Sequence, residues 1–299
     1  MSRKALDGQA IALMVVLCAL WGMQQVAVKV AVPSINPVMQ MGLRCLVAGV
    51  LLIMLMLVRR EGFSFRDGRF GAGIGVGLLF SLEFLLIALG LLYTTASHMV
   101  VFLYTAPVYV ALGVHFLVPG EKLSITQWLG VGLAFSGIVC AFSGGLFTAT
   151  GKDFADMLLG DGLAILASIV WAATTVMIRA SSLSDAPASQ TLLYQLAMAA
   201  ILLTGGGVIA GQWQEIQMAP IAWVSMAYQS LIVAFGSFLV WFWLLRRYLA
   251  SPLSTFSFLT PLFGVTFGVI LLGDPVDIWF GLGAVLVVAG IGLVSWKRG

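Results

Sequence analysis

Residues 96–121 read A-S-H-M-V-V-F-L-Y-T-A-P-V-Y-V-A-L-G-V-H-F-L-V-P-G-E, and a related stretch at residues 250–274 reads A-S-P-L-S-T-F-S-F-L-T-P-L-F-G-V-T-F-G-V-I-L-L-G-D. Both copies hold a proline inside an apolar run, Pro107 in the first and Pro261 in the second, and both end in an acidic residue. A second, glycine-rich apolar run follows each copy. A match of this length indicates internal duplication, and duplication within an apolar chain is typical of membrane transporters.

The composition places the chain in a membrane. Hydrophobic residues make up 61% of it and charged residues only 9%, whereas soluble domains carry roughly 25% charged residues. A helix needs about 20 residues to cross the roughly 30 Å of hydrocarbon in a bilayer. We therefore predict an all-α integral membrane protein with ten transmembrane helices, at about residues 10–31, 38–58, 70–92, 96–118, 127–146, 158–180, 187–210, 220–245, 250–272 and 278–296.

The distribution of positive charge predicts the orientation of the chain. Twelve of the fifteen Lys and Arg residues fall on one side of the ten-helix arrangement, Lys29 and Lys152 fall on the other, and Arg44 lies within a helix. Because cytoplasmic loops are rich in Lys and Arg, both termini are expected in the cytoplasm, with the protein in the inner membrane of the cell. The first apolar run is not interpreted as a cleaved signal peptide, since its loss would leave nine helices and invert the charge bias.

The two halves are related by a constant offset. The segment L-W-G-M-Q-Q-V-A-V-K at 20–29 matches V-W-A-A-T-T-V-M-I-R at 170–179, 150 residues later. Each half holds five helices, an odd number, so the second half enters the membrane from the opposite face. We predict two inverted five-helix repeats around a central cavity, the first over residues 1–146 and the second over 158–299, joined by an extracellular linker at 147–157.

Several motifs resemble one known family. They are the W-G-x-x-x-V-A-x-K segment at 21–29, the Leu43-Arg44 pair, the A-L-x-x-x-Y-T-x-A-S segment at 88–97 and the elbow that ends in Glu121. Together they resemble the EamA domain, two tandem copies of which form a transporter of the drug/metabolite superfamily. The resemblance covers nearly the whole chain. Within the superfamily the chain is similar to bacterial exporters of amino acids and related metabolites, including the YddG-type exporters of aromatic amino acids.

The chain departs from the family pattern at two positions. Gln24 stands where the family often has Asn, and Asp274 stands where the second repeat often has Glu. The resemblance implies that helices 1 to 4 and 6 to 9 surround the cavity while helices 5 and 10 support it from outside. The glycines of helices 3, 5 and 10 are expected to pack helices together within one chain, with a dimer face as the alternative.

Ionisable groups inside the membrane are candidates for function because each costs roughly 2.5–3.5 kcal/mol to insert. At 1.5 Å per residue, Arg44 and Glu83 come out at the same depth, and Gln24 reaches that level too. We predict that Arg44 and Glu83 form a charge pair beside Gln24, which would offer a zwitterionic substrate two complementary handles. The alternative is a pair that only fixes helix packing.

Aromatic residues near the middle of helices are expected to line the cavity, where they would enclose an apolar side chain. Trp21 and Trp171 are equivalent in the two repeats and are the leading pair, with packing alone as the alternative for any one aromatic. The predicted substrate-binding residues are Trp21, Gln24, Arg44, Glu83, Phe84, Tyr104, Trp171, Thr174, Tyr228 and Trp241.

Other residues suggest moving parts or proton transfer. Pro107 and Pro261 each remove a backbone hydrogen bond within a helix, so we predict kinks that could act as hinges. Glu83 and His98 are the candidates for proton coupling, although a lone histidine in a membrane is more often a hydrogen-bonded packing residue. The elbow residues Glu121 and Asp274 are expected to cap the helices that follow them.

Enzymatic activity is not expected. Gly160-Asp161 and Gly273-Asp274 resemble half of the G-x-G-D site of intramembrane proteases, but leucine replaces the first glycine in both. The chain contains neither a G-x-S-x-G nor an H-E-x-x-H motif. No metal site or cofactor is predicted.

The sequence therefore predicts an inner-membrane transporter that exports small metabolites by alternating access, most plausibly amino acids with aromatic or other hydrophobic side chains. The alternatives are export of cationic drugs or of nucleosides and purines, or a passive channel. Expected partners are the small substrate and the lipid bilayer, without nucleic acid. We expect a monomer.

Overall fold

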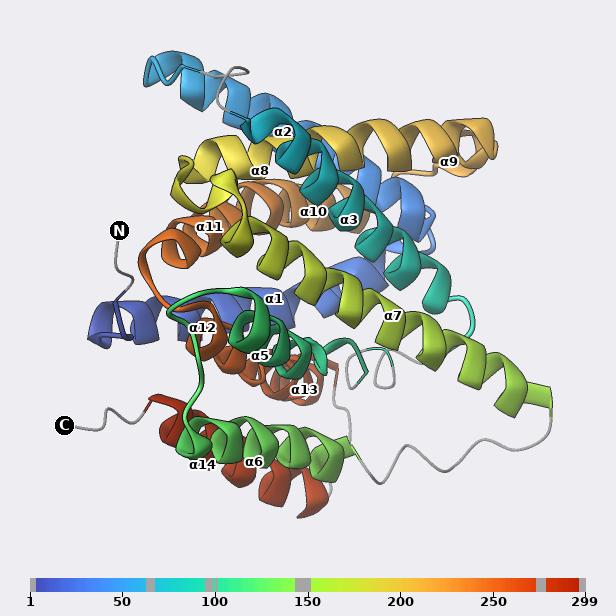
Figure 1. The fold of residues 1–299 in the computed structure, drawn as a ribbon. Helices are drawn as coiled ribbons and strands as arrows, with labels where there is room; N and C mark the ends of the chain where they lie inside the picture. The colour runs from blue at the N-terminus through green and yellow to red at the C-terminus, as the bar shows by residue number, and fades with distance from the viewer. Residues whose placement is uncertain are drawn as a thin grey trace.

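The computed structural model describes residues 4–62, 68–94, 99, 102–142, 152–272 and 278–295. Within these ranges the chain is built from helices, and the one β-bridge joins Lys4 to Tyr248. The first half contributes α1 (Gly8–Ala31), α2 (Pro37–Val58), α3 (Arg69–Gly90), α5 (Ala106–Leu117) and α6 (Ile125–Phe142) (Figure 1). The second half contributes α7 (Lys152–Ala180), α8 (Ala188–Ala199), α9 (Gly205–Ile209), α10 (Pro220–Ala227), α11 (Phe238–Arg247), α12 (Ala250–Phe256), α13 (Leu259–Leu272) and α14 (Ile278–Ser295).

The described helices match the predicted membrane segments. Six stretches are long and apolar enough to cross a membrane, and α5, α6 and α14 add shorter apolar helices. A π-helical turn, Ala200–Thr204, joins α8 to α9, and a longer π-helical segment, Tyr228–Ser237, joins α10 to α11. The protein is an all-α membrane protein, as predicted.

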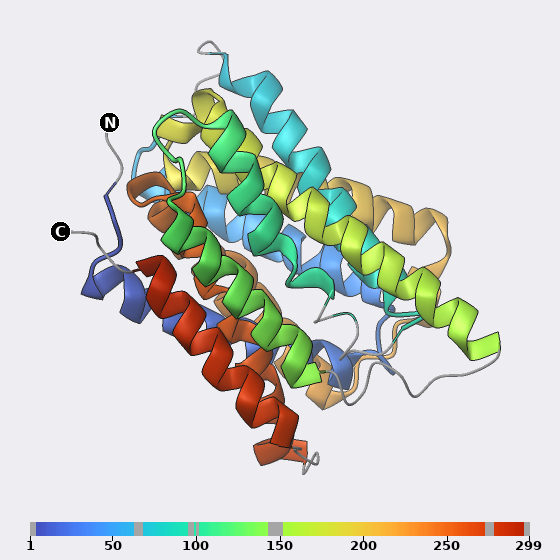
Figure 2. The same cartoon turned by 60° about the horizontal axis from the view of Figure 1, so that its bottom comes forward.

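The helices of the two halves interleave. From the first half, α3 packs against α7 and α8, α2 packs against α8 and the π-helical turn that follows it, and α1 packs against α13. This arrangement places the core between the repeats rather than within either one. The pair α6 and α14 lies at one side of the bundle (Figures 1 and 2), where the resemblance placed helices 5 and 10.

Glycines allow α6 and α14 to approach each other closely. A Cβ atom added at Gly137 would lie 2.7 Å from the carbonyl oxygen of Gly283, and one at Gly130 would lie 2.7 Å from that of Gly290. Small residues are the usual means of close helix packing in lipid. Packing within one chain is therefore confirmed at these positions, whereas a Cβ at Gly132 would meet open space.

The two prolines lie beside breaks, not kinks within continuous helices. A turn at Tyr104–Thr105 precedes α5, and a turn at Ser257–Phe258 separates α12 from α13. Pro107 and Pro261 then fall in the first turn of the new helix, where a backbone N–H has no helical partner to lose. The hydroxyl of Thr105 donates to the Phe102 carbonyl oxygen at 2.7 Å and so satisfies one acceptor at the break.

Helix α7 begins earlier than predicted. It starts at Lys152, inside the expected linker 147–157, instead of at residue 158. The segment Lys-Asp-Phe-Ala-Asp-Met at 152–157 contains neither proline nor glycine, and acidic residues are favourable in the first turn of a helix. The helix therefore extends beyond the apolar run that predicted it.

The elbow acid of the first repeat does not cap the next helix. At the start of α6, the backbone N–H of Ser124 donates to Gln127 Oε1 at 3.0 Å, and the N–H of Gln127 donates to Ser124 Oγ at 3.3 Å. This reciprocal capping box leaves no role there for Glu121, so that prediction was wrong. Asp274 lies outside the described residues.

Candidate functional site

A central cavity lies between the two halves. It is lined by residues of α1, α2, α3, α7, α8 and α11 and of the segment before α5, and it holds about 990 Å³ of space free of protein atoms, its opening included. Eight of the ten predicted substrate-binding residues line it: Trp21, Gln24, Glu83, Phe84, Tyr104, Trp171, Thr174 and Trp241.

Two tryptophans related by the repeat, Trp21 and Trp171, each pack against an aromatic neighbour in the cavity wall. The Trp21 ring lies edge-on to Trp241, with 5.7 Å between ring centroids, and its indole N–H donates to Ser237 Oγ at 2.9 Å. In the equivalent position on α7, the Trp171 ring lies edge-on to Tyr104 at 5.5 Å. These contacts hold both tryptophans in fixed orientations, so the wall is formed before a ligand enters.

A third aromatic group was only partly predicted. Phe80 and Phe84, one turn apart on α3, have ring centroids 4.7 Å apart, and Phe238 of α11 lies 5.9 Å from Phe80. All three line the cavity. Phe80 and Phe238 were missed because the many phenylalanines of the chain carry no signal that separates a cavity wall from a lipid-facing surface.

Glu83 is the one carboxylate that lines the cavity in the part of the chain described by the structure. It is 7% exposed and lies on α3 between Ser81 and Phe84. A carboxylate in an apolar, aromatic wall is a strong attractor for a cationic group, because little water competes for it. Its position makes it the dominant polar feature of the site.

Arg44 is not where the sequence placed it. Its side chain is fully buried, but it does not line the cavity, and its guanidinium carbon lies 4.5 Å from the centroid of the Phe84 ring. Its nitrogens have no hydrogen-bond partner among the described residues. Arg44 and Glu83 therefore do not form the expected direct hydrogen-bonded charge pair, and the neighbour found for the guanidinium is the Phe84 ring.

Gln195 of α8 is a cavity residue that the sequence analysis missed. It is fully buried, it lines the cavity, and neither its amide oxygen nor its amide nitrogen has a hydrogen-bond partner within the described ranges. A buried amide without partners is costly unless a ligand or water completes it. An amide within an apolar run was a usable signal, but the sequence analysis gave weight to charged and aromatic residues instead.

The remaining candidates fall into different places. The hydroxyl of Tyr228 donates to the Leu20 carbonyl oxygen at 2.9 Å, and Tyr228 is not among the lining residues; its polar end is engaged in packing α1 against the second half. Thr174 lines the cavity, yet its hydroxyl donates to the Val170 carbonyl oxygen of its own helix at 2.9 Å. His98 lies outside the described residues.

An all-helical membrane protein whose two interleaved halves enclose an aromatic cavity with one buried carboxylate has the architecture of a multi-pass membrane transporter. The chain belongs to the EamA-like transporter family, whose model matches residues 8–143 and again residues 158–296. The two matches correspond to the two predicted repeats.

Several proteins are similar over nearly the full length. The uncharacterized transporter YoaV of Bacillus subtilis is 25% identical over 277 residues, which cover 91% of each chain. A probable amino-acid metabolite efflux pump of Escherichia coli is 25% identical and covers 100% of this chain and 98% of its own. A solved crystal structure shares the fold, with a TM-score of 0.80 at 17% identity over 98% of this chain and 99% of that one.

Proposed function

We propose that this transporter exports amino acids with aromatic or other hydrophobic side chains across the cell membrane, by exposing the central cavity alternately to its two sides. The observation that carries the proposal is the cavity itself, an aromatic enclosure with Glu83 and Gln195 as polar groups. The similarity to the probable amino-acid metabolite efflux pumps of Escherichia coli and Salmonella typhimurium supports the same substrate class.

The chemistry of the cavity suits the two ends of an amino acid. The Glu83 carboxylate would pair with the substrate ammonium, while the unpartnered Gln195 amide nitrogen would donate to the carboxylate. The tryptophans and phenylalanines would enclose the apolar side chain. Arg44, behind the Phe84 ring, would favour the substrate carboxylate through space rather than by direct contact.

A second candidate function is export of organic cations. The observation that favours it is that Glu83 lines the cavity while Arg44 does not, so the site has a negative charge without a positive one at its surface. Aromatic faces also attract cations. A substrate with an amine and no carboxylate would then be accepted as well as an amino acid.

The charge distribution and the fold support a proposed orientation and assembly. Both termini would lie in the cytoplasm, as the positive-inside rule indicates, and the segment between the halves would lie outside. The glycines of α6 pack against those of α14 within one chain, which supports a monomer. Transport would need neither a cofactor nor a metal ion.

The test is uptake into proteoliposomes of aromatic amino acids, aliphatic amino acids, nucleosides and organic cations, with and without a pH gradient. We expect saturable uptake of aromatic amino acids, mutual competition between them, and faster uptake when the vesicles are preloaded with substrate. Uptake of cations alone would replace the amino-acid proposal with the second candidate. Flux that neither saturates nor responds to preloading would indicate a channel.

A matched pair of variants links this result to the cavity. Gln195→Leu removes the unpartnered amide and should weaken amino-acid uptake while leaving uptake of an amine without a carboxylate unchanged. Gln217→Leu, at a position outside the cavity lining, serves as the control. If Gln195→Leu lost uptake of both substrates equally, the Gln195 amide would not be the group that recognises the substrate carboxylate.

A further inference from the structure

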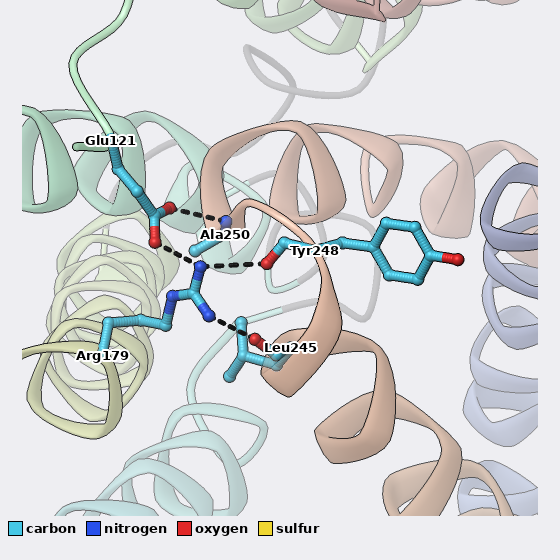
Figure 3. Close-up of polar contacts among 5 residues, drawn as sticks. All are labelled: Glu121, Arg179, Leu245, Tyr248 and Ala250. Carbon is cyan, nitrogen blue, oxygen red and sulfur yellow. Dashed lines mark hydrogen bonds and ion pairs between the residues drawn. The ribbon is translucent and has the colours of Figure 1, made fainter. Parts of the chain in front are cut away.

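A second charged cluster lies away from the cavity and joins the two halves. Glu121 belongs to the elbow between α5 and α6, and Arg179 lies in the last turn of α7. Their side chains form an ion pair through Glu121 Oε1 and Arg179 Nη2, and they are only 5% and 1% exposed, respectively. Glu121 Oε2 also accepts a hydrogen bond of 2.8 Å from the backbone N–H of Ala250, where α12 begins (Figure 3).

The same arginine fixes the connection between α11 and α12. Its Nη2 donates to the Tyr248 carbonyl oxygen at 2.9 Å, and its Nη1 donates to that of Leu245 (Figure 3). Glu121 is the single first-half residue of this network drawn in Figure 3, and every group that it contacts there belongs to the second half. The Glu121 carboxylate therefore holds the α5–α6 elbow against α7 and the start of α12, and Arg179 extends the network to the α11–α12 connection.

The N-terminal segment also forms hydrogen bonds with the connection between α11 and α12. The backbone N–H of Lys4 donates to the Arg247 carbonyl oxygen at 3.0 Å, and that of Leu249 donates to the Lys4 carbonyl oxygen at 3.2 Å. The hydroxyl of Tyr248 donates to Asp7 Oδ2 at 2.8 Å. We call the end of the bundle where α1 begins and α14 ends the terminal face; Figures 1 and 2 show the start of α1 and the end of α14 at this same end.

Arg179 of the ion pair lines a small pocket that adjoins the central cavity. Ile178 and Phe242 line the central cavity and also a small second pocket, whose other lining residues include Arg179 and Leu245. A route from the cavity to the terminal face through this second pocket would pass these two apolar side chains and then Arg179 with its partner Glu121. Opening this path requires the elbow to move away from α7 and α12.

A buried ion pair is suited to a two-state contact. While the interface is dry, separating the pair would keep the Glu121 carboxylate and the Arg179 guanidinium buried without their mutual attraction, which is strongly unfavourable. Once water enters, each charge is solvated and the pair contributes little. The contact therefore resists partial opening and favours a fully closed or a fully open interface.

We propose that Glu121 and Arg179 form a latch that holds the terminal face closed, and that its release accompanies exposure of the cavity to that side. The inference goes beyond the proposed function, because it concerns which side is open and holds for any substrate. The latch gives Glu121 a role other than the helix cap expected from the sequence. It also gives Arg179 a role beyond its contribution to the positive charge of one membrane side.

The test measures access to the cavity without any substrate. A single cysteine is placed at Thr175, a lining residue, after Cys18, Cys45 and Cys140 are replaced by alanine. Vesicles whose outer surface exposes a C-terminal tag are then treated with a membrane-impermeant maleimide. Because a hydrogen-bonded charge contact is lost, we expect Glu121→Gln to speed labelling about tenfold relative to the parent.

A second variant guards against misfolding. Glu121→Gln removes the carboxylate partner of a buried arginine. The double variant Glu121→Gln with Arg179→Gln leaves neutral groups that still hydrogen-bond, and it should also label faster. Arg179→Lys keeps the charge but loses the planar fork, so it should give an intermediate rate. Folding of each variant is checked by gel filtration in detergent.

The control is Glu61→Gln. Glu61 also contacts the second half at this face, through the hydroxyl of Ser189, but it is partly exposed, so its variant should label at the parent rate. The proposal is overturned if the double variant and Arg179→Lys both fold and both label at the parent rate. The pair would then be a purely structural contact. That result would not affect the substrate assignment, which is tested by uptake.

Discussion

Single residues of this transporter carry charge in places where water is scarce, and their surroundings decide what each charge does. Glu83 lies in the cavity wall, and Arg44 lies behind the Phe84 ring. Arg179 forms an ion pair with Glu121 and donates hydrogen bonds to two backbone carbonyls. Of these, only Glu83 can meet a substrate directly in this conformation. The functional prediction at this scale therefore concerns Glu83.

Replacing Glu83 by Gln should raise the KM for amino-acid uptake at least about tenfold, since a hydrogen bond to a charged group contributes about 1.5–3 kcal/mol. If Glu83 also carries the coupled proton, the response of uptake to a pH gradient should disappear. Both quantities are measured in proteoliposomes, with Glu61→Gln as the control. Unchanged KM and pH response in a folded Glu83→Gln protein would remove Glu83 from the mechanism.

Asp7 gives a pH prediction outside the membrane. Hydrogen bonds from the Ala10 backbone N–H and then from the Tyr248 hydroxyl lower the pKa of its carboxyl below the ordinary value of 3.8. A lowered pKa means that the carboxylate stabilises the fold above the ordinary pKa, and that this stabilisation is lost as the pH falls through the lowered one. The melting temperature of Asp7→Asn should thus lie below that of the parent at neutral pH.

The stabilisation by Asp7 should also depend on pH. The difference in melting temperature between the parent and Asp7→Asn should shrink below about pH 4, as the parent carboxylate becomes protonated. Thermal unfolding in detergent at several pH values measures it. A difference that stays constant down to the lowest pH would show that the ionised form of Asp7 adds nothing.

At the scale of helices, the membrane changes what sequence patterns mean. Lipid is as apolar as a protein core, so close backbone packing and satisfied hydrogen bonds decide which faces meet. The glycines of α6 and α14 and the turns before Pro107 and Pro261 are both expressions of this rule. Two glycines on α6, Gly137 and Gly132, differ sharply in their surroundings and allow a direct test.

Gly137→Ala would place a methyl group 2.7 Å from the Gly283 carbonyl oxygen and from the Val287 nitrogen. Backbone atoms cannot yield as a flexible side chain can, so we expect a loss of about 1–3 kcal/mol of stability. Gly132→Ala, which meets open space, should change stability by no more than about 0.5 kcal/mol. Thermal unfolding of the two variants in detergent checks this, and equal effects would contradict close packing of α6 on α14.

For the whole molecule, the interleaving of the halves puts the cavity at their boundary and the latch at one end of it. Neither repeat alone could form either feature, because each needs side chains from both. Because the repeats are inverted, the second half begins at the membrane face opposite to the one where the first half begins. The charge bias predicts that both termini lie on the cytoplasmic side.

The orientation can be measured with reporter fusions. A fluorescent protein fused after residue 299 should fold and fluoresce in the cytoplasm, whereas alkaline phosphatase fused within 147–157 should be active outside. The reciprocal fusions should be inactive, since each reporter works on one side only. Active phosphatase at the C-terminus would invert the proposed orientation.

Local pattern by itself determined the membrane class, the ten apolar segments, the duplication and eight of the residues that line the cavity. These features rest on composition, span length and the 150-residue offset, which act along the chain. Trp21 and Trp171, for instance, were identified from the repeat alone. The capping of α6 was also local, yet the acid Glu121 was assigned to it in place of Ser124 and Gln127.

Only the tertiary structure decided how the buried charges are partnered. Equal depth suggested that Arg44 and Glu83 would touch, but depth does not say which way a side chain turns around its helix, and Phe84 stands against the guanidinium. Glu121 and Arg179 meet across 58 residues, and Ala250 joins them from 129 residues away. Such contacts depend on how the two halves interleave, which is a property of the packed molecule and not of any one stretch of its sequence.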